Sequence, residues 1–398
     1  MKPIVIAGAG PVGCAAALYL SENEIPVVLL EGRSELPRDL RASTFHPPTL
    51  DMLSDLGLTD GMLDQGLVVP NYQYRDRQSN EIADFKLDRL DGETEHPFRL
   101  QCEQFKMTAL SVDKLKRFPK AEVIFSSQVQ GFSETSDGVD VLCFTDKGEQ
   151  LISASFLIGA DGADSRVRRA GGVMFKGMTY PERFLVASTT FPFQNHFDNL
   201  SWVNYVSDPD EWCVLLKTLD LWRVLIPTPI DDFDEKYLSD EYIQDRLQRL
   251  ISTQDGYDIM HRTLYRVHQR VAERYRVRDR VLLAGDAAHI NNPLGGMGMN
   301  GGIHDAINLS EKLVRIIKHD GDRDQMLNQY DRQRRGICVK FIQEHTRKNK
   351  ALMEASERDI QQRRQDDLMR ACSDPILEKE FLMRTSMIDC VRESYSIQ

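Results

Sequence analysis

The 398-residue sequence lacks features that define several classes of protein. Its seven cysteines are scattered and contain no CxxC pair, which argues against a disulfide framework or a metal site and indicates a reducing compartment. No apolar run approaches the roughly 18 residues that a membrane span needs. The apolar run near the N-terminus is short and glycine-rich, unlike a signal peptide. These absences predict a soluble, cytoplasmic globular protein.

An excess of positive charge is also missing. The formal net charge is −11, which argues against nucleic acid or an anionic membrane surface as the main partner. The hydrophobic content of 41% is sufficient for a substantial core, and the length allows two or three domains. We therefore expect the partners to be small molecules.

The stretch from Val281 to Leu309 combines four features in one short segment. Val281 to Ala284 is predicted to form a buried strand, and an acidic turn follows at Gly285 and Asp286. Three glycines occur within residues 295–298, and apolar positions then recur at helical spacing. The first-turn N–H groups and dipole of such a helix suit an electron-rich ring or an anion. The alternative is an ordinary strand-loop-helix crossing.

A second glycine-rich segment follows the predicted strand at residues 3–7. The sequence GAGPVG has the GxGxxG spacing, opens a helix of small residues, and precedes a strand that ends at Glu31. This context is the one that a dinucleotide-binding fingerprint requires, although a coincidental turn is the alternative. Its glycines would admit a pyrophosphate, and the carboxylate would accept hydrogen bonds from ribose hydroxyls. The residues of this segment are Gly8, Gly10, Pro11, Val12 and Gly13.

The next loop contains Arg33, Arg38 and Arg41. These arginines either contact cofactor phosphates or form a solvated loop, and the sequence favours neither interpretation. His46 precedes the Pro-Pro pair that starts a helix, a position where a histidine caps or packs more often than it acts as a base.

Alternating patterns predict a hairpin around Ser79 and Asn80 and a strand-to-helix transition near Gln101. Several strands between Val123 and Ile158 are predicted to form a meander. The segments 211–217 and 221–227 are predicted to pair, and residues 311–398 to be helical. The predicted meander ends in the sequence GADGADSRVRR at residues 159–169.

Three stretches together resemble the signatures of the FAD-dependent aromatic hydroxylases, the single-component flavoprotein monooxygenases typified by para-hydroxybenzoate hydroxylase. They are GAGPVG with Glu31, GADGADSRVR with Asp161, and AGDAAH…P.GG.GMN with Asp286, in the family's order over roughly residues 3 to 313. Met297 stands where many relatives have glutamine, and Asn292 where many have a second proline. Each departure could alter the mobility of the glycine loop or the polarity of the pocket.

The resemblance implies an α/β fold. We expect a Rossmann-like FAD-binding domain of the para-hydroxybenzoate hydroxylase type, with an inserted mixed β-sheet substrate domain and a helical C-terminal region. The expected boundaries are 1–174 and 276–320 for the discontinuous FAD-binding domain, 175–275 for the substrate domain and 321–398 for the helical region. The last helix is expected to cover the pocket or to form a subunit contact, as in a homodimer.

The resemblance also assigns expected cofactor contacts. The glycines of the first signature would hold the pyrophosphate, Glu31 the adenosine ribose and Asp286 the ribityl hydroxyls. Asp161 belongs to a motif associated with both FAD and the nicotinamide cofactor. Residues 298–300 would lie near the flavin N1 and C2 carbonyl, where a helix dipole stabilises negative charge. The complete expected set is Gly8, Gly10, Pro11, Val12, Gly13, Glu31, Arg33, Arg41, Ala42, Gln101, Asp161, Gly285, Asp286, Gly296, Gly298, Met299 and Asn300.

Substrate-pocket residues carry a weaker signal, because for each of them ordinary sheet packing or a solvated face is the alternative. The candidates for substrate contact or catalysis are His46, Tyr74, Tyr205, Arg223 and Pro293, and the pocket could also include Trp212 and Trp222. The segment WRVLIP partly matches a halogenase signature, but Val224 replaces its second tryptophan, which disfavours that activity.

The implied activity is hydroxylation of an electron-rich aromatic ring, such as a phenol, an aminobenzoate or a hydroxypyridine. By resemblance, NADH or NADPH reduces FAD, O2 adds at C4a, and the hydroperoxyflavin transfers oxygen to the ring. Only one GxGxxG segment is present, so we expect the nicotinamide to bind transiently. A reductase or dehydrogenase of the same fold is one alternative. A non-catalytic binding protein is another, which the presence of Asp286 and the glycine loop disfavours.

Overall fold

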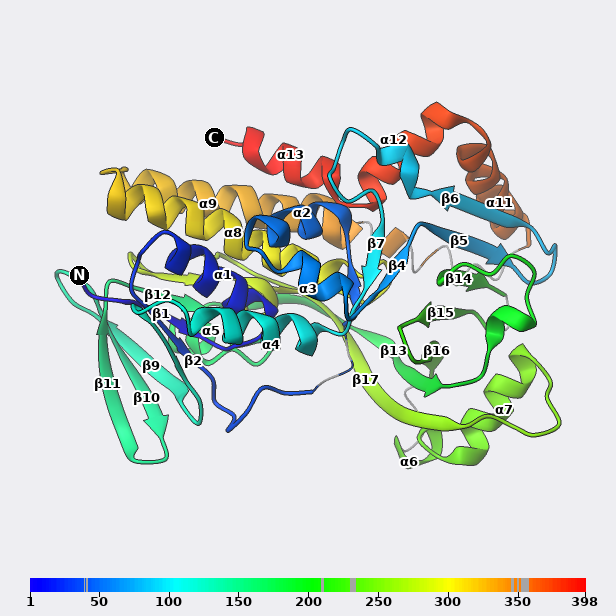
Figure 1. The fold of residues 1–398 in the computed structure, drawn as a ribbon, viewed down its shortest axis with the longest axis horizontal. Coiled ribbons are helices and arrows are strands. Elements are labelled where there is room, and N and C mark those ends of the chain that lie inside the picture. The colour runs from blue at the N-terminus through cyan, green and yellow to red at the C-terminus, as the bar shows by residue number, and fades with distance from the viewer. Residues whose placement is uncertain are drawn as a thin grey trace.

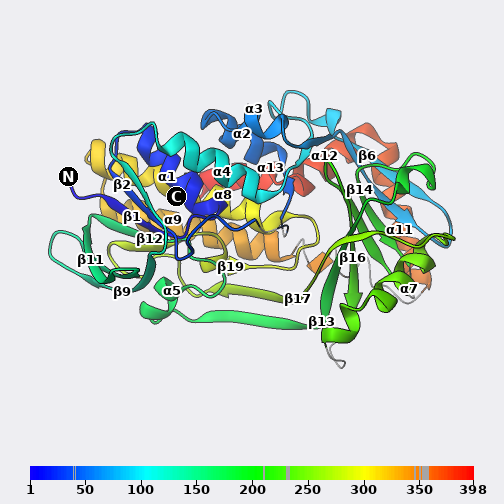
Figure 2. The ribbon, with the colours of Figure 1, turned by 60° about the horizontal axis from the view of Figure 1, so that its bottom comes forward.

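The computed structural model describes residues 1–38, 40, 42–208, 211–229, 234–344, 347–348, 351 and 358–398. A five-stranded parallel sheet with the order β18-β12-β1-β2-β8 forms one half of the molecule. Helices α1 and α4 lie on one side of this sheet and a three-stranded meander lies on the other (Figure 2). The sheet comprises β1 (Ile4–Ala7), β2 (Val27–Leu30), β8 (Ala121–Ile124), β12 (Phe156–Gly159) and β18 (Val281–Leu283).

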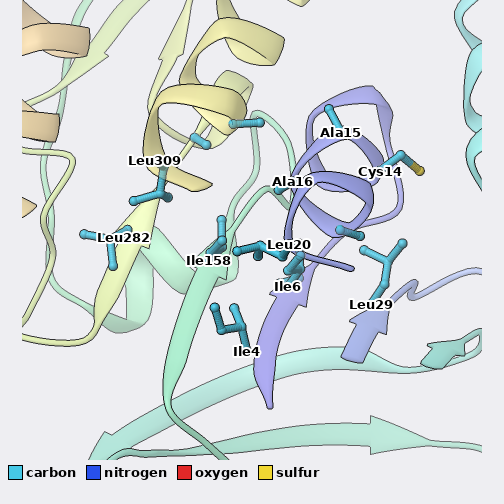
Figure 3. Packing of buried hydrophobic residues seen from close by; sticks show 14 of the residues in the cluster. Ile4, Ile6, Cys14, Ala15, Ala16, Leu20, Leu29, Ile158, Leu282 and Leu309 are labelled. Carbon is cyan, nitrogen blue, oxygen red and sulfur yellow. The ribbon is translucent and has the colours of Figure 1, made fainter. Parts of the chain in front are cut away.

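The core of this half forms because the central strands are apolar on both faces. Ile6 of β1 and Ile158 of β12 are fully buried, and small residues of α1 such as Ala16 lie against them (Figure 3). Because alanine side chains are short, α1 (Pro11–Glu22) approaches the sheet closely, and α8 (Met297–Lys318) and α4 (Gln104–Leu115) lie beside it. The packing therefore fixes where the N-termini of α1 and α8 point.

The meander contains only part of the segment predicted to form it. Its strands are β9 (Gln128–Glu134), β10 (Val139–Thr145) and β11 (Gly148–Ala154). The two flanking apolar runs, residues 121–124 and 156–159, instead join the parallel sheet, so the prediction was wrong for them. The physical reason is visible in β12, which is buried on both faces between two parallel neighbours, whereas β11 is largely exposed.

An eight-stranded mixed sheet forms the other half, with the order β19-β17-β13-β16-β15-β14-β5-β6 (Figure 1). All neighbours are antiparallel except β14 and β5. The predicted hairpin and the predicted strand pair are confirmed as β5-β6 and β15-β16. The strands are β5 (Asn71–Asp76), β6 (Ile82–Lys86), β13 (Phe175–Thr189), β14 (Val203–Ser207), β15 (Cys213–Lys217), β16 (Trp222–Thr228), β17 (Ile259–Ala272) and β19 (His289–Ile290).

A small sheet and the C-terminal helices connect the two halves. The small sheet has the order β3-β7-β4, and α11 and α12 lie against β6 and the turn that follows it. The described part of residues 311–398 is mainly helical, as predicted, with non-helical connections at 319–322, 374 and 386–387. None of the described helices is long and apolar enough to cross a membrane. The remaining elements are β3 (Thr44–Phe45), β4 (Leu67–Val69), β7 (Arg99–Gln101), α2 (Pro47–Asp55), α3 (Thr59–Leu63), α5 (Arg166–Ala170), α6 (Asp234–Tyr237), α7 (Asp240–Leu250), α9 (Arg323–Ile337), a π-helical turn (Cys338–Ile342), α11 (Arg358–Ser373), α12 (Pro375–Thr385) and α13 (Ile388–Ser396), with 3-10 turns at Leu87–Leu90, Phe193–Asn195 and Gly285–Ala287.

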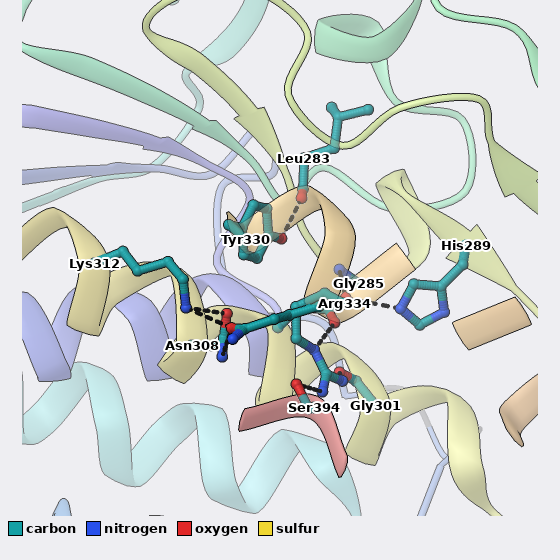
Figure 4. A network of polar contacts seen from close by, with 11 residues as sticks. Leu283, Gly285, His289, Gly301, Asn308, Lys312, Tyr330, Arg334 and Ser394 are labelled. Atoms are coloured by element: carbon teal, nitrogen blue, oxygen red, sulfur yellow. Dashed lines mark hydrogen bonds and ion pairs between the residues drawn. The ribbon is translucent and has the colours of Figure 1, made fainter. Parts of the chain in front are cut away.

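A buried ionic network fixes α8 to α9 and β19 (Figure 4). Asp305 of α8 accepts hydrogen bonds from Arg334 Nε at 2.7 Å and from the Gly285 N–H at 3.1 Å, and it pairs with His289 Nε2 at 2.7 Å. Burial by itself would raise the pKa of Asp305, but His289 and Arg334 lower it to about 2. The Asp305 carboxylate therefore stays ionised and holds the turn that precedes the glycine loop.

We expect Asp305→Asn to lower the free energy of unfolding by about 3–5 kcal/mol, because it leaves the buried Arg334 without its charged partner. Asp324→Asn, which removes an exposed partner of Arg276, serves as the control and should leave the free energy of unfolding nearly unchanged, because solvent screens an exposed ion pair. Denaturant unfolding measures both.

The effect of Asp305→Asn should also depend on pH. Since the folded-state pKa of Asp305 is lowered, its contribution is present above the ordinary carboxyl range near 3.8 and is lost as the pH falls toward 2. The stability difference between wild type and Asp305→Asn should therefore narrow in acid. A difference that is small at neutral pH would contradict this account of the network.

Candidate functional site

The three glycines of the GAGPVG segment have different structural roles. A Cβ atom on Gly8 would lie 2.4 Å from the Ala160 carbonyl oxygen, and one on Gly13 would lie 1.9 Å from the Gly8 carbonyl oxygen. A Cβ on Gly10 would meet no atom within 4 Å. Gly10 is also the N-cap of α1, and no side chain caps that helix. The outer two glycines therefore permit close packing, while the middle one borders open space at an uncapped helix N-terminus.

Glu31 lies directly after β2, beside the glycine segment. Its two carboxylate oxygens accept hydrogen bonds from the N–H groups of Ala9 and Arg33, each at 3.0 Å. These bonds hold the carboxylate in place and leave each oxygen a further lone pair. The Arg33 side chain is exposed, and the Ala42 carbonyl accepts the Gln104 N–H at 3.0 Å. Arg41, a predicted cofactor contact, lies outside the described residues.

Asp161 holds the start of α5. Its carboxylate accepts the N–H groups of Arg166 at 2.7 Å and Val167 at 3.1 Å, and the Ser165 hydroxyl also donates to it. Arg168, which the sequence analysis did not single out, donates to the Ala287 carbonyl at 2.9 Å. The second signature is therefore tied directly to the third. The arginine was visible in the segment SRVR, but its partner is a backbone atom more than 100 residues away.

The third signature places Asp286 on the exposed side of a 3-10 turn, whereas Gly285 and Ala287 are buried. Gly285 has φ +63°, and a Cβ there would lie 2.6 Å from Val12 of α1. Gly296 is the left-handed N-cap of α8, with φ +67°, and no side chain caps that helix. The helix was expected to begin after Gly298, but α8 already begins at Met297.

Asn300 anchors the first turn of α8. Its side chain accepts the His46 N–H at 3.0 Å and donates to the carbonyls of Thr44 at 2.8 Å and Gly296 at 2.6 Å. The His46 ring is fully buried and its Nε2 lies 2.8 Å from the Gly295 carbonyl oxygen. A Cβ on Gly296 would lie 3.1 Å from the Thr44 Cβ atom. The loop is thus fixed against β3 and the start of α2, which favours the packing interpretation of His46.

Other residues of the loop also have defined partners. The Pro293 carbonyl accepts the Gly296 N–H at 3.0 Å, and Asn292 Oδ1 accepts the Leu294 N–H at 3.1 Å. Met297 is buried with Ile337, Met387 and Cys390. Met297 therefore anchors the helix start to the C-terminal helices, which disfavours a role in pocket polarity. Met299 is partly buried against the core, and a Cβ on Gly298 would lie 3.3 Å from Asn291 Oδ1.

An aromatic cluster adjoins the glycine loop. Tyr74 of β5 and Tyr205 of β14 are direct neighbours in the sheet, and their rings stack with centroids 4.9 Å apart. Each is 5% exposed, and neither hydroxyl hydrogen-bonds to any residue that the structure describes. Trp212 and, from the loop, Leu294 belong to the same cluster. Two hydroxyl groups without a hydrogen-bond partner among the described residues therefore belong to the cluster that Leu294 of the loop joins.

Trp222 and Arg223 point to opposite faces of the sheet because they are adjacent in β16. Trp222 packs with Phe193 in the other core and donates from Nε1 to Gln194 at 2.9 Å, which favours the packing interpretation of this residue. Arg223 donates to the Ser43 hydroxyl at 3.1 Å. Ser43 in turn donates to Gln101 at 3.0 Å, which also contacts Thr44. Arg223 therefore links the large sheet to the segment beside the glycine loop.

The residues present fit FAD as the implied cofactor. Two helices of 12 and 22 residues start without side-chain caps, and a space that a Cβ would enter lies at the first of them. Free N–H groups at a helix N-terminus bind phosphate oxygens, and carboxylates accept bonds from hydroxyls. Glu31 accepts the N–H of Ala9, just before the start of α1, and Asp286 lies in the turn that precedes the glycine loop at the start of α8. The donor set therefore matches a dinucleotide with an electron-rich ring.

Comparisons with known proteins agree with this fit. A family model described as an FAD binding domain matches residues 1–345. The chain is 33% identical over 391 residues to para-nitrophenol 4-monooxygenase of Pseudomonas sp. (strain WBC-3), covering 96% of this chain and 94% of that protein. It is 33% identical over 348 residues to 6-hydroxy-3-succinoylpyridine 3-monooxygenase of Pseudomonas putida (strain DSM 28022 / S16), covering 85% and 86%. The crystal structure of p-nitrophenol 4-monooxygenase from Pseudomonas putida DLL-E4 matches with a TM-score of 0.91 and 30% identity, covering 98% of both chains.

The different environments of Gly10 and Gly13 allow a paired test. Gly10→Ala should fold with stability within about 1 kcal/mol of wild type, since its φ is −73° and the Cβ meets no protein atom. It should nevertheless weaken FAD binding at least about tenfold, which corresponds to about 1.4 kcal/mol. Gly13→Ala should destabilise the fold by about 1–3 kcal/mol, because the Cβ meets backbone.

FAD titration of the apoprotein and thermal unfolding measure the two effects separately. Unchanged FAD affinity in Gly10→Ala would place the pyrophosphate elsewhere.

Proposed function

The chain belongs to the FAD-dependent aromatic monooxygenases, and on that basis we propose that it hydroxylates a small phenol-like or hydroxypyridine-like ring, with NADH or NADPH as reductant and O2 as oxidant. The two relatives at 33% identity carry names that specify a nitrophenol and a hydroxypyridine as substrates. Both are single rings with an electron-donating oxygen, which supports this substrate class.

The observation that carries the proposal is the meeting of the aromatic cluster with the glycine loop. Leu294 of the loop packs in the same cluster as Tyr74 and Tyr205. An aromatic ring held against these tyrosines would lie beside the loop and the start of α8, where the flavin is expected. Stacked aromatic side chains bind planar rings well, and their hydroxyls add direction to the binding.

We assign the cofactor contacts as the family resemblance implies. Bound FAD would supply the activation of O2, using electrons from the nicotinamide. The N–H groups at the start of α1 would bind the pyrophosphate, Glu31 the ribose and Asp286 the ribityl hydroxyls. The start of α8 would stabilise negative charge on the ring through its dipole. The proposed contacts are the residues Gly8, Gly10, Pro11, Val12, Gly13, Glu31, Arg33, Arg41, Ala42, Gln101, Asp161, Gly285, Asp286, Gly296, Gly298, Met299 and Asn300.

The protein's own side chains would orient the substrate and exclude water. Burial raises the pKa of Tyr74 well above its ordinary value, so its hydroxyl stays protonated and can donate to a substrate oxygen. Tyr205 would provide the second hydroxyl. Arg223, His46 and Pro293 act through the loop in this proposal, since their contacts run to Ser43, Gly295 and Gly296. They are positioning residues.

Two further expectations remain proposals. One is the division into an FAD-binding domain at 1–174 and 276–320, a substrate domain at 175–275 and a helical region at 321–398. Strands β5 and β6 add residues 71–86 to the large sheet, so the substrate site would draw on both of the first two parts. The other is a homodimer formed through the C-terminal helices.

The proposed activity is tested by NAD(P)H oxidation with and without aromatic compounds. A substrate that binds more tightly when the flavin occupies its reducible position shifts the population toward that position, so substrate should control reduction. We expect a panel of phenols, aminobenzoates and hydroxypyridines to contain at least one compound that accelerates flavin reduction about tenfold or more in stopped flow, with an oxygenated product.

Product analysis with O2 consumption distinguishes the alternative. Equal reduction rates throughout the panel, without an oxygenated product, would identify a reductase.

A further inference from the structure

Arg99 is a buried cation without a protein partner for most of its donors. It lies in β7 and is 2% exposed. Its Nε and Nη1 atoms have no hydrogen-bond partner, and no carboxylate pairs with it, among the residues that the structure describes. A buried guanidinium with unsatisfied N–H groups is costly, and proteins ordinarily pair such groups with an anion. The missing partner is therefore expected to come from a ligand.

The position of Arg99 places its free donors at the proposed substrate site. Arg99 and Gln101 are two residues apart in β7, so their side chains lie on the same face of the small sheet. Gln101 contacts Ser43 and Thr44, beside the glycine loop. The guanidinium carbon of Arg99 lies 3.9 Å from the centre of the Tyr72 ring. Arg99 thus lies between the cofactor segment and the aromatic cluster.

The neighbouring tyrosines extend the donor set. Tyr72 meets Tyr74 and Tyr205 edge to face, with centroids 6.1 Å and 6.4 Å apart. The Tyr72 hydroxyl hydrogen-bonds to the Thr385 hydroxyl at 2.7 Å, whereas the hydroxyls of Tyr74 and Tyr205 have no hydrogen-bond partner within the described part of the chain. A buried cation and two hydroxyl groups of the adjoining aromatic cluster therefore have donors without acceptors among the described residues.

We propose that Arg99 is a specificity-determining residue that binds an anionic oxygen of the aromatic substrate, a phenolate or a carboxylate. This inference rests on the proposed function, because it requires an aromatic substrate on the Tyr74 and Tyr205 face. Arg99 satisfies its N–H groups with the substrate oxygen, and it favours the ionised form of a bound phenol. An ionised phenol is also the more electron-rich ring.

The competing role for Arg99 is purely structural, because its contact with Tyr72 could serve only to pack the ring. The two roles differ in their dependence on ligand charge. A packing residue affects charged and neutral ligands alike, whereas an anion-binding residue affects the charged ligand selectively.

The test measures the equilibrium binding of ligands to FAD-loaded enzyme. Changes in flavin absorbance report the binding. Three probes are compared: 4-nitrophenol as its phenolate, 4-hydroxybenzoate as a carboxylate, and 4-nitroanisole as a neutral ring of similar size. Arg99→Gln should raise the Kd of whichever anion binds in wild type by about ten- to a hundredfold. The Kd of 4-nitroanisole should change less than about twofold. A parallel loss for charged and neutral probes, or no loss for either anion, would overturn the proposal.

Arg384→Gln is the matched control. Arg384 also contributes positive charge near Tyr72 and Tyr74, but its side chain is exposed. Its removal should change the Kd of the anions less than about threefold, since solvent screens an exposed charge. An effect as large as that of Arg99→Gln would show that general charge, not direct binding, is responsible, and would overturn the proposal.

A measurement on the wild-type enzyme remains decisive if Arg99→Gln fails to fold. The ionised and protonated forms of 4-nitrophenol absorb differently, so the pKa of the bound phenol can be titrated. It should lie at least about one unit below its value in solution, a tenfold preference for the phenolate. An unshifted or raised pKa would overturn the proposal. Because none of these measurements requires turnover, ligands that bind as expected without being hydroxylated would contradict the proposed function and leave this inference standing.

Discussion

The site depends on one steric constraint, the close contact of α1 with the turn at Gly285 and with helix α8. A Cβ on Gly285 would lie 2.6 Å from Val12, and one on Gly302 would lie 2.7 Å from the same side chain. A Cβ on Gly8 would meet Ala160 of the second signature, and one on Gly13 would meet the Gly8 carbonyl within the first. Only glycine at positions 285 and 302 lets the first and third signatures touch. This contact brings the uncapped starts of α1 and α8 to one side of the parallel sheet.

Electrostatics then separates a structural part of the site from a binding part. The carboxylate of Asp305 pairs with Arg334 and His289 within the protein, and it accepts the Gly285 N–H and so fixes that turn. Arg99 is as deeply buried, but its charge has no such match among the described residues. The first arrangement stabilises the scaffold. The second leaves binding energy available for a ligand.

The sequence was sufficient for features that depend on local pattern. The strand, helix and strand around the GAGPVG segment and the two strand pairs were predicted, because periodicity and turn chemistry are local. It was insufficient where tertiary contacts decide. Which of Trp222 and Arg223 would face the glycine loop could not be assigned, and the run at 156–159 could not be separated from the meander.

The missed residues share a physical reason. Arg99 lies in a strand of three residues, too short to show alternation, and its importance appears only when its burial is known. Arg168 acts through the Ala287 carbonyl, a backbone atom that is far away in the chain. Such partners leave no pattern in a single sequence.

We propose that the start of α1 binds the pyrophosphate and the start of α8 contacts the flavin ring of one FAD molecule. A crystal structure of the FAD-bound protein tests it most directly. The account predicts the pyrophosphate against the N–H groups after Gly10, and the flavin ring between the start of α8 and the Tyr74 and Tyr205 face. A pyrophosphate bound away from Gly10, or a flavin ring with no contact to residues 296–300, would contradict it.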